Sequence, residues 1–191
     1  ETGDPVRRSR ICAVVEAAAA LAAGACAAAP ASPAAWAVDL RSGRTVARRG
    51  ERAFAARAFP PGSLIKPFTA LAALESGAWD AASVRVCAAS PPTAPVFDAC
   101  WYRRGHGPLS LEQAIGVSCD RYFRAVAEAL DPAVFREALA RFGLLDGGSF
   151  APSGRREAVE AMVGTGRALR TTPQALLSAY CALAADGRLR S

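Results

Sequence analysis

The order of apolar and polar residues has the period of β-strands near the start of the chain and the period of helices through most of the rest. From 35 to 48, the segment AWAVDLRSGRTVAR has two short runs of alternating apolar residues on either side of a Ser-Gly pair, which predicts a β-hairpin. A helix is predicted from about Ser63 to Ser76, because the breakers Pro-Pro-Gly precede it and Gly77 follows it.

The second half of the chain carries helix signals almost throughout. Ser110 and Gln113 form a capping box in front of an apolar segment. Apolar side chains three and four residues apart then predict a buried helical face, made of Phe123, Val126, Ala127 and Leu130. The helices predicted in this half are 111–116, 119–130, 131–142 and 155–163, and a last one from Thr172 to just before Gly187.

Residues 80–109 are rich in proline and lack a clear period, so we expect an irregular, exposed segment there. The predicted order is therefore a hairpin and then helices, with no return to strands before Ser191. Two strands are too few for a stable sheet. We predict one mixed α/β (α+β) domain over 35–191, made of a helix-rich subdomain and an antiparallel sheet that is incomplete at its C-terminal side.

Residues 1–34 differ in composition from the rest and support two interpretations. Basic residues precede an Ala/Val/Leu stretch and then small residues with Pro and Ser, which is typical of a secretory signal peptide or a membrane anchor. The tetrapeptide AGAC, which ends at Cys26, weakly resembles a lipoprotein cleavage box. The alternative is an Ala-rich amphipathic helix, since Glu16 interrupts the apolar stretch. The first interpretation, which we favour, places the protein outside the cytoplasm.

The formal net charge of +6 raises the question of nucleic-acid binding. The arginines are scattered in ones and twos without interleaved aromatic residues, as in a solvated surface, so we predict no nucleic-acid partner. Of 23 basic residues, only Lys66 is a lysine. Arginine is the default cation of this sequence, and the exception at position 66 therefore points to a chemical requirement.

The six cysteines indicate a disulfide more readily than a metal site. No two of them have the C-x-x-C spacing of zinc or redox sites, and His106 is the only histidine, so we predict no metal and no cofactor. Cys87 and Cys100 flank a Pro-rich loop, CAASPPTAPVFDAC, which a disulfide would close in an oxidising compartment. Cys119 and Cys181 lie in mostly apolar helical segments, where a buried free thiol is the simplest expectation.

Ser63 and Lys66 are three residues apart, so a helix would place them on one face within hydrogen-bond reach. A serine hydroxyl is a poor nucleophile until a base takes its proton, and a lysine can act as that base. An arginine cannot, because its guanidinium keeps its proton. S-x-x-K alone is a weak pattern, but the solitary lysine strengthens the hypothesis of a nucleophile and its base.

Several segments resemble penicillin-binding protein transpeptidases, in the family's order. FPPGSLIKPFTALAALESG resembles their active-site segment, usually P-P-G-S-x-x-K-P. LSLEQAIGVSCDRYF resembles their second motif, S-x-N, with Ser118, Cys119 and Asp120 in its three places. CWYRRGHGPLSL and GTGRALRTTPQALLSAYCALAADGRL are similar to further segments, the first of them typical of monofunctional, elongation-type members. The match runs from about Ala35 to the end of the chain.

The resemblance implies the serine β-lactamase/transpeptidase-like fold and a role for each matching residue. Ser63 would be the acylated nucleophile, Lys66 its general base, and Ser118 a proton relay to the leaving amine. Asp120 would hold the substrate's amide side chain and help to fix Lys66. The implied reaction is attack on the D-Ala-D-Ala stem peptides of peptidoglycan in the bacterial cell envelope, and β-lactams would acylate the same serine.

Two departures from the family pattern matter. Asp120 replaces the commoner Asn, so an amide donor is lost and an anion is placed where it weakens Lys66 as a base; acidic variants occur in elongation-type members, and we interpret the change as tuning. No K-[ST]-G follows Ser118, because VGTG at 163–166 lacks the lysine and leads into a helix. We expect the third motif and the remaining strands to lie beyond Ser191, and residues 1–191 alone to be weakly active or inactive.

Two other functions stay open at this point. A non-catalytic binding or scaffold protein would keep the fold without the third motif, and its natural reading frame would end soon after Ser191. A β-lactamase or β-lactam sensor is the second alternative, although the sequence indicates no base for a deacylating water. The sequence does not distinguish transpeptidation from carboxypeptidation.

Overall fold

A computed structural model of the chain describes residues 35–40, 42–50, 56–95 and 97–185. The segment 1–34, with both interpretations of it, and the predicted helix stop at Gly187 lie outside these ranges. Within them, none of the helices combines the length and the apolar character that crossing a bilayer requires.

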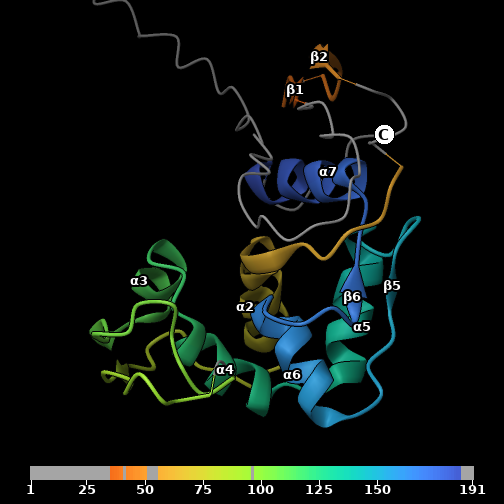
Figure 1. The fold of residues 1–191 in the computed structure, drawn as a ribbon. Helices are drawn as coiled ribbons and strands as arrows, with labels where there is room; N and C mark the ends of the chain where they lie inside the picture. Colours follow the sequence, from red (N-terminus) through yellow and green to blue (C-terminus); the bar gives the residue numbers. More distant parts are fainter. Residues whose placement is uncertain (1–34, 41, 51–55, 96, 186–191) are drawn as a thin grey trace, which may run out of the picture.

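The segment FPPGSLIKPF leads into a helix near the centre of the molecule (Figure 1). It opens with a 3₁₀ turn, η1 (Gly62–Ile65), and continues as α2 (Lys66–Glu75), which confirms the helix predicted from Ser63 to Ser76. Helices α4 (Asp120–Ala129), α5 (Pro132–Arg141) and α6 (Arg155–Val163) pack against α2. The first turn of this central helix is therefore surrounded by residues distant in sequence.

The later helices begin where their capping residues predict. In α3 (Leu111–Gly116), Ser110 and Gln113 form the reciprocal capping box. Helix α5 starts after Asp131, whose side chain accepts a hydrogen bond from the Ala133 amide. The predicted face of α4 is fully buried, which places Phe123, Val126, Ala127 and Leu130 in the core. Thr172 caps the last helix, α7 (Pro173–Ala184).

The predicted hairpin forms as β1 (Ala35–Val38) and β2 (Thr45–Arg49), which pair antiparallel. Every residue of β2 is exposed and β1 is half-buried, so the pair buries little apolar surface within the described chain. The fold is a mixture of helices and small antiparallel sheets, as predicted.

The expectation that no strand follows the hairpin was wrong. Strands β3 (Arg85–Cys87) and β4 (Gly107–Leu109) pair within the segment expected to be irregular. Strands β5 (Ser149–Phe150) and β6 (Leu169–Arg170) pair further along. Ladders of two or three residues are too short to show a period of alternation, and each pair joins segments separated by many residues, so local pattern did not reveal them.

Helix α7 lies across the end of α2 that follows η1, in the upper part of Figure 1. The Phe68 ring packs edge-on against the rings of Phe142 and Tyr180, with centroids 5.3 Å apart in both pairs. The Tyr180 hydroxyl donates a 2.8 Å hydrogen bond to the carbonyl of Leu64, next to Ser63. Apolar packing and one polar contact thus hold the 3₁₀ turn in place.

Candidate active site

Ser63 lies in the 3₁₀ turn at the start of the central helix, with its side chain exposed to solvent. Gly62 takes a left-handed conformation (φ +61°) that favours glycine, and Lys66 is the first residue of α2. One turn of helix separates the two side chains, and the Lys66 Nζ atom lies 3.0 Å from Ser63 Oγ. The predicted pairing of nucleophile and base is therefore present in the geometry.

Lys66 is almost fully buried, at 2% exposure, and its amine lies among four oxygens. Besides Ser63 Oγ, Nζ approaches Ser118 Oγ at 2.9 Å, the Ser118 carbonyl at 3.1 Å and Asp120 Oδ1 at 2.7 Å. An ammonium has three hydrogens for these four neighbours. Only the two hydroxyls can also donate, so they are the groups able to reverse their hydrogen bond when Lys66 releases a proton.

Ser118 adopts a left-handed conformation (φ 52°), the one such non-glycine residue in the described part of the chain. A conformation of this kind costs of order 1–3 kcal/mol and persists only where surrounding contacts hold it. Here the Ser118 carbonyl accepts hydrogen bonds from Lys66 Nζ and from the indole Nε1 of Trp101, both at 3.1 Å. The strained turn points the Ser118 hydroxyl at the same amine that faces Ser63.

Asp120 is buried and forms an ion pair with Lys66, 2.7 Å from Oδ1 to Nζ. Its other carboxylate oxygen, Oδ2, accepts a 3.1 Å hydrogen bond from the backbone N–H of Trp101. Asp120 is also the first residue of α4, where the helix dipole favours a negative charge. The carboxylate therefore fixes the buried amine from one side and is itself held by Trp101.

Trp101 was not singled out by the sequence analysis, although its indole and its amide both contact the site. Its side chain is 62% exposed, which is unusual for a tryptophan. Exposure of this kind points to a functional residue, but it can be seen only in the structure. Val117 and Leu64, next to the two serines, also expose apolar surface. The exposed Ser63 hydroxyl is thus bordered by apolar side chains.

The Gly-x-Gly segment that follows α6 packs directly against the Ser63 turn. Gly164 ends α6 in a left-handed conformation (φ +87°). A Cβ atom there would overlap the Gly62 carbonyl group and lie 2.9 Å from the Ser63 amide nitrogen. Only glycine allows the two backbones to approach in this way.

We expect Gly164→Ala to destabilise the fold by about 2–5 kcal/mol, from the left-handed conformation and the overpacking together. It should also slow reactions at Ser63, because the 3₁₀ turn must shift. Thermal unfolding of the full-length protein measures the first effect. Gly77→Ala is the matched control, since Gly77 is also left-handed (φ +72°) but has open space around the position of a Cβ. Equal losses in the two variants would contradict the packing role of Gly164.

Comparison with models of known protein families identifies the domain. Residues 34–191 match the model of the penicillin binding protein transpeptidase domain. The chain belongs to this family. The match covers the 3₁₀ turn, the second motif and the last helix, and it confirms the resemblance found in the sequence.

Solved structures of this transpeptidase family have the same fold. A complex of Pseudomonas aeruginosa PBP2 with WCK 5153 is 27% identical over 64% of this chain and 33% of its own, with a TM-score of 0.54. The transpeptidase domain of Burkholderia pseudomallei penicillin-binding protein 3 is 23% identical, with a TM-score of 0.67, over 82% of this chain and 51% of its own. A peptidoglycan glycosyltransferase from Burkholderia ambifaria is 24% identical, with a TM-score of 0.66, over 82% of this chain and 54% of its own. The chain thus spans between a third and about half the length of these structures. A search of curated proteins found no match.

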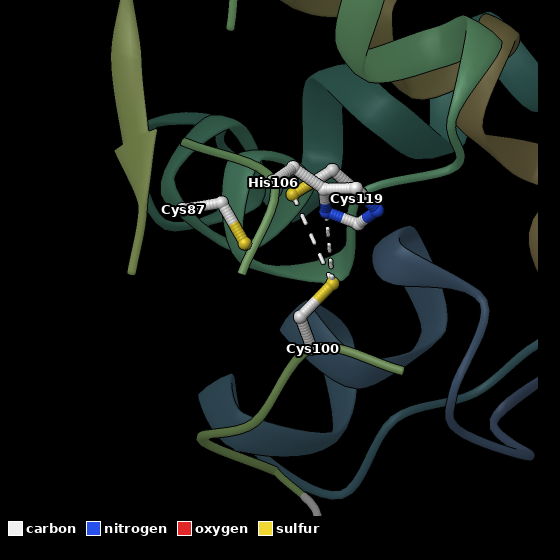
Figure 2. A group of neighbouring side chains, drawn as sticks. All are labelled: Cys87, Cys100, His106 and Cys119. Atoms are coloured by element: carbon white, nitrogen blue, oxygen red, sulfur yellow. Dashed lines mark hydrogen bonds between the residues drawn. The ribbon is translucent and has the colours of Figure 1, made fainter. Parts of the chain in front are cut away.

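The cysteines of this transpeptidase domain lie differently from the prediction. The structure has Cys87 and Cys100 as free thiols, so the predicted disulfide between them is not present. Two further ligand-type side chains share the same space: Cys100 Sγ lies 3.9 Å from Cys119 Sγ and 3.6 Å from His106 Nδ1. We call the four residues Cys87, Cys100, His106 and Cys119 the thiol cluster, and Figure 2 shows their side chains converging.

The fold assembles the thiol cluster from separate segments. Cys87 ends β3, His106 directly precedes β4, and Cys119 caps α4. Gly105 permits the approach, because a Cβ on it would lie 2.5 Å from the Cys87 carbonyl oxygen. The three thiols are buried, with at most 2% exposure. C-x-x-C spacing could not reveal this group, because its ligand-type atoms meet only through tertiary structure.

The thiol cluster has the dimensions of a tetrahedral metal site. Its four ligand atoms lie within 4.8 Å of one another. Around a metal with bonds of about 2.3 Å to sulfur and 2.0–2.1 Å to nitrogen, tetrahedral neighbours are about 3.6–3.8 Å apart. The measured 3.9 Å and 3.6 Å separations fit these edges. Burial, with the neighbouring Cys87 and Cys100 thiols, raises the pKa of the Cys119 thiol to about 12, so without a cation it stays protonated.

Proposed function

We propose that this chain is part of a serine D,D-transpeptidase or D,D-carboxypeptidase that acts on the D-Ala-D-Ala stem peptides of peptidoglycan. The proposal assigns Ser63 as nucleophile, Lys66 as general base, Ser118 as proton relay and Asp120 as the group that fixes Lys66. The observation that carries it is one buried amine 3.0 Å from Ser63 Oγ and 2.9 Å from Ser118 Oγ. Family membership supports the same roles.

In the acylation step, neutral Lys66 takes the proton of the Ser63 hydroxyl as Ser63 Oγ attacks the carbonyl carbon of the penultimate D-Ala. A new C–O bond forms and the C–N bond to the terminal D-Ala breaks. The departing nitrogen needs a proton, which Lys66 supplies through the Ser118 hydroxyl. The Ser63 amide N–H, at the start of the helix, is the nearest candidate to stabilise the developing oxyanion.

The acyl-enzyme is resolved by a second nucleophile. When the amine of another stem peptide attacks the ester, the product is a cross-link; when water attacks, the product is a shortened stem peptide. In both cases Ser118 and Lys66 accept the proton of the nucleophile and return one to Ser63 Oγ. The exposed apolar side chains of Leu64, Val117 and Trp101 offer surface for the substrate's methyl groups.

The proposed place of action is the bacterial cell envelope, where peptidoglycan is made, and β-lactams are the proposed covalent ligands. One relative was solved as a complex with WCK 5153, and another, from Helicobacter pylori, as a complex with MreC. By analogy, binding of a small molecule and of a protein partner of the same kind is proposed for the full-length protein. An N-terminal membrane or lipid anchor stays a proposal from residues 1–34.

Acylation by a fluorescent penicillin tests the proposal in the full-length protein. We expect covalent labelling of the wild-type protein and none of Ser63→Ala, because this variant lacks the hydroxyl that we assign as the nucleophile. Ser76→Ala, at the far end of the same helix, is the matched control and should label like wild type. Labelling that persists in Ser63→Ala, or that is missing in wild type, would overturn the assignment of Ser63.

A further inference from the structure

The carbonyl of Leu64 lies one residue after the proposed nucleophile, where the 3₁₀ turn η1 passes into α2. In a 3₁₀ turn each carbonyl accepts a hydrogen bond from the N–H three residues further on, as the Ser63 carbonyl does from Lys66. For Leu64 that residue is Pro67, which has no N–H. The turn therefore supplies no 3₁₀ partner for this carbonyl.

The Tyr180 hydroxyl supplies a donor from α7. It donates a hydrogen bond to the Leu64 carbonyl oxygen, 2.8 Å away. Two features direct the phenol to this place: its ring stands edge-on against Phe68 in α2, and Leu176 and Ala179 anchor α7 in the core. Burial raises the pKa of Tyr180 to about 12, so the hydroxyl keeps its donor hydrogen at neutral pH.

Core packing does not hold the exposed part of the turn. In the described chain, Ser63 and Leu64 both expose their side chains. Before the serine, Gly164 packs against the carbonyl group of Gly62. After the serine, the Tyr180 hydrogen bond holds the next carbonyl. The Ser63 backbone therefore lies between two restraints, and the second of them comes from a single hydroxyl.

We propose that Tyr180 is a positioning residue, whose hydroxyl holds the Leu64 carbonyl so that Ser63 Oγ stays within reach of the Lys66 amine during acylation and deacylation. This inference rests on the proposed function, because it takes Ser63 as the nucleophile. Tyr180 acts through the backbone of the turn and transfers no proton in the reaction.

The separation that this contact protects is the one between nucleophile and base. Lys66 Nζ lies 3.0 Å from Ser63 Oγ, and the amine is held from elsewhere by Ser118 and Asp120. A shift of the turn alone would therefore change the distance from Ser63 to its base. A displacement of about 1 Å can lower a rate about a hundredfold, and the loss of one hydrogen bond permits a smaller shift than that.

Tyr180→Phe in the full-length protein tests the inference, because it removes the hydroxyl and keeps the ring against Phe68. Stopped-flow acylation with a fluorescent penicillin separates the dissociation constant of the non-covalent complex from the acylation rate constant. We expect the rate constant to fall about five- to tenfold, with the dissociation constant within about twofold of wild type. General damage to the fold would instead lower the fraction of protein that is acylated, while the rest would react at the wild-type rate.

Tyr122→Phe is the matched control. The Tyr122 hydroxyl also donates a 2.8 Å hydrogen bond to a backbone carbonyl, that of Ser83, and it accepts one from the buried Trp79 indole. This variant should lose stability and keep the wild-type acylation rate constant, because the lost bonds do not reach the Ser63 turn.

A conservative replacement tests whether the donor itself is required. With 4-aminophenylalanine in place of Tyr180, an N–H donor takes the position of the hydroxyl and the ring is kept. We expect this replacement to restore the acylation rate constant to within about threefold of wild type, because the Leu64 carbonyl again has a donor.

Hydrogen exchange of the turn gives a readout that does not depend on catalysis. In Tyr180→Phe, the backbone amides of residues 63–66 should exchange about two- to tenfold faster, which is the range that one hydrogen bond contributes. Wild-type protein that is not acylated would remove the proposed function, while the exchange would still show whether Tyr180 holds the turn.

Three results would overturn the inference. The first is a Tyr180→Phe protein whose acylation rate constant stays within about twofold of wild type, or whose turn exchanges no faster. The second is an equal fall of the rate constant in Tyr122→Phe, which would make the effect one of stability. The third is a defect that 4-aminophenylalanine leaves unchanged, which would show that the hydrogen bond to Leu64 is not what matters.

Discussion

Replacing Lys66 by Arg should reduce the rate of penicillin acylation by about 10²–10⁴-fold, the usual contribution of a general base. The arginine keeps the positive charge and can still pair with Asp120, which lies 2.7 Å from Nζ in the wild-type protein. It cannot give up its proton to become a base. The variant therefore separates the two roles that the structure gives to Lys66, charge partner and proton acceptor.

The rate is measured by stopped-flow or gel-based acylation of the full-length protein with a fluorescent penicillin. Arg156→Lys is the matched control, because Arg156 is on the surface of α6 and pairs with Glu160. It should acylate at the wild-type rate, which shows that exchange of the two cations is harmless elsewhere. A Lys66→Arg protein that acylates within threefold of wild type would exclude Lys66 as the base.

Replacing Asp120 by Ala should destabilise the protein by about 3–5 kcal/mol, because the Lys66 charge is left buried without its partner. Lys66 is 2% exposed, so water cannot take the place of the carboxylate. The Trp101 amide also loses its acceptor. Urea unfolding of the full-length protein, followed by circular dichroism, measures the loss.

Glu75→Ala is the control for this prediction. The Glu75 side chain is 45% exposed and that of its partner Arg141 is 60% exposed, so their ion pair is screened by solvent and should contribute at most about 1 kcal/mol. The two variants remove the same chemical group from different environments. Similar losses of stability in both would mean that the Lys66–Asp120 pair is not a buried pair in solution.

The helices were predictable because their signals are local. Ser110 and Gln113 cap α3 as expected, Asp131 caps α5, and the buried face of α4 follows from apolar spacing alone. The short strand pairs were not predictable. β3 and β4 are each three residues long and join segments some twenty residues apart, so their pairing depends on tertiary structure.

The candidate active site also has residues that local sequence pattern predicted and residues that it did not. Ser63 and Lys66 are neighbours on one helix, so physical reasoning from the sequence was enough to pair them. Ser118 and Asp120 were added only through the resemblance to transpeptidases, because nothing local shows that a turn 52 residues from Lys66 lies beside it. Trp101 contacts the site through its exposed indole and its backbone, and neither property has a sequence signature.

The thiol cluster is the clearest feature that local sequence pattern did not predict. The sequence favoured a disulfide between Cys87 and Cys100, because they flank one loop and no cysteine pair had metal-ligand spacing. The structure instead gathers their sulfurs with Cys119 and His106 from three segments of the chain. Cys119 had been expected to be an ordinary buried thiol, and it is buried, but beside two other thiols.

The central claim is that Ser63 is the residue that becomes acylated. Trypsin digestion of the full-length protein after reaction with penicillin, followed by tandem mass spectrometry, locates the adduct directly. The Lys66–Pro67 bond resists trypsin, so Ser63 falls in one peptide from Ala58 to Arg85. We predict the penicilloyl mass on that peptide, with fragment ions that assign it to Ser63. An adduct on any other residue, Ser118 included, would contradict the account.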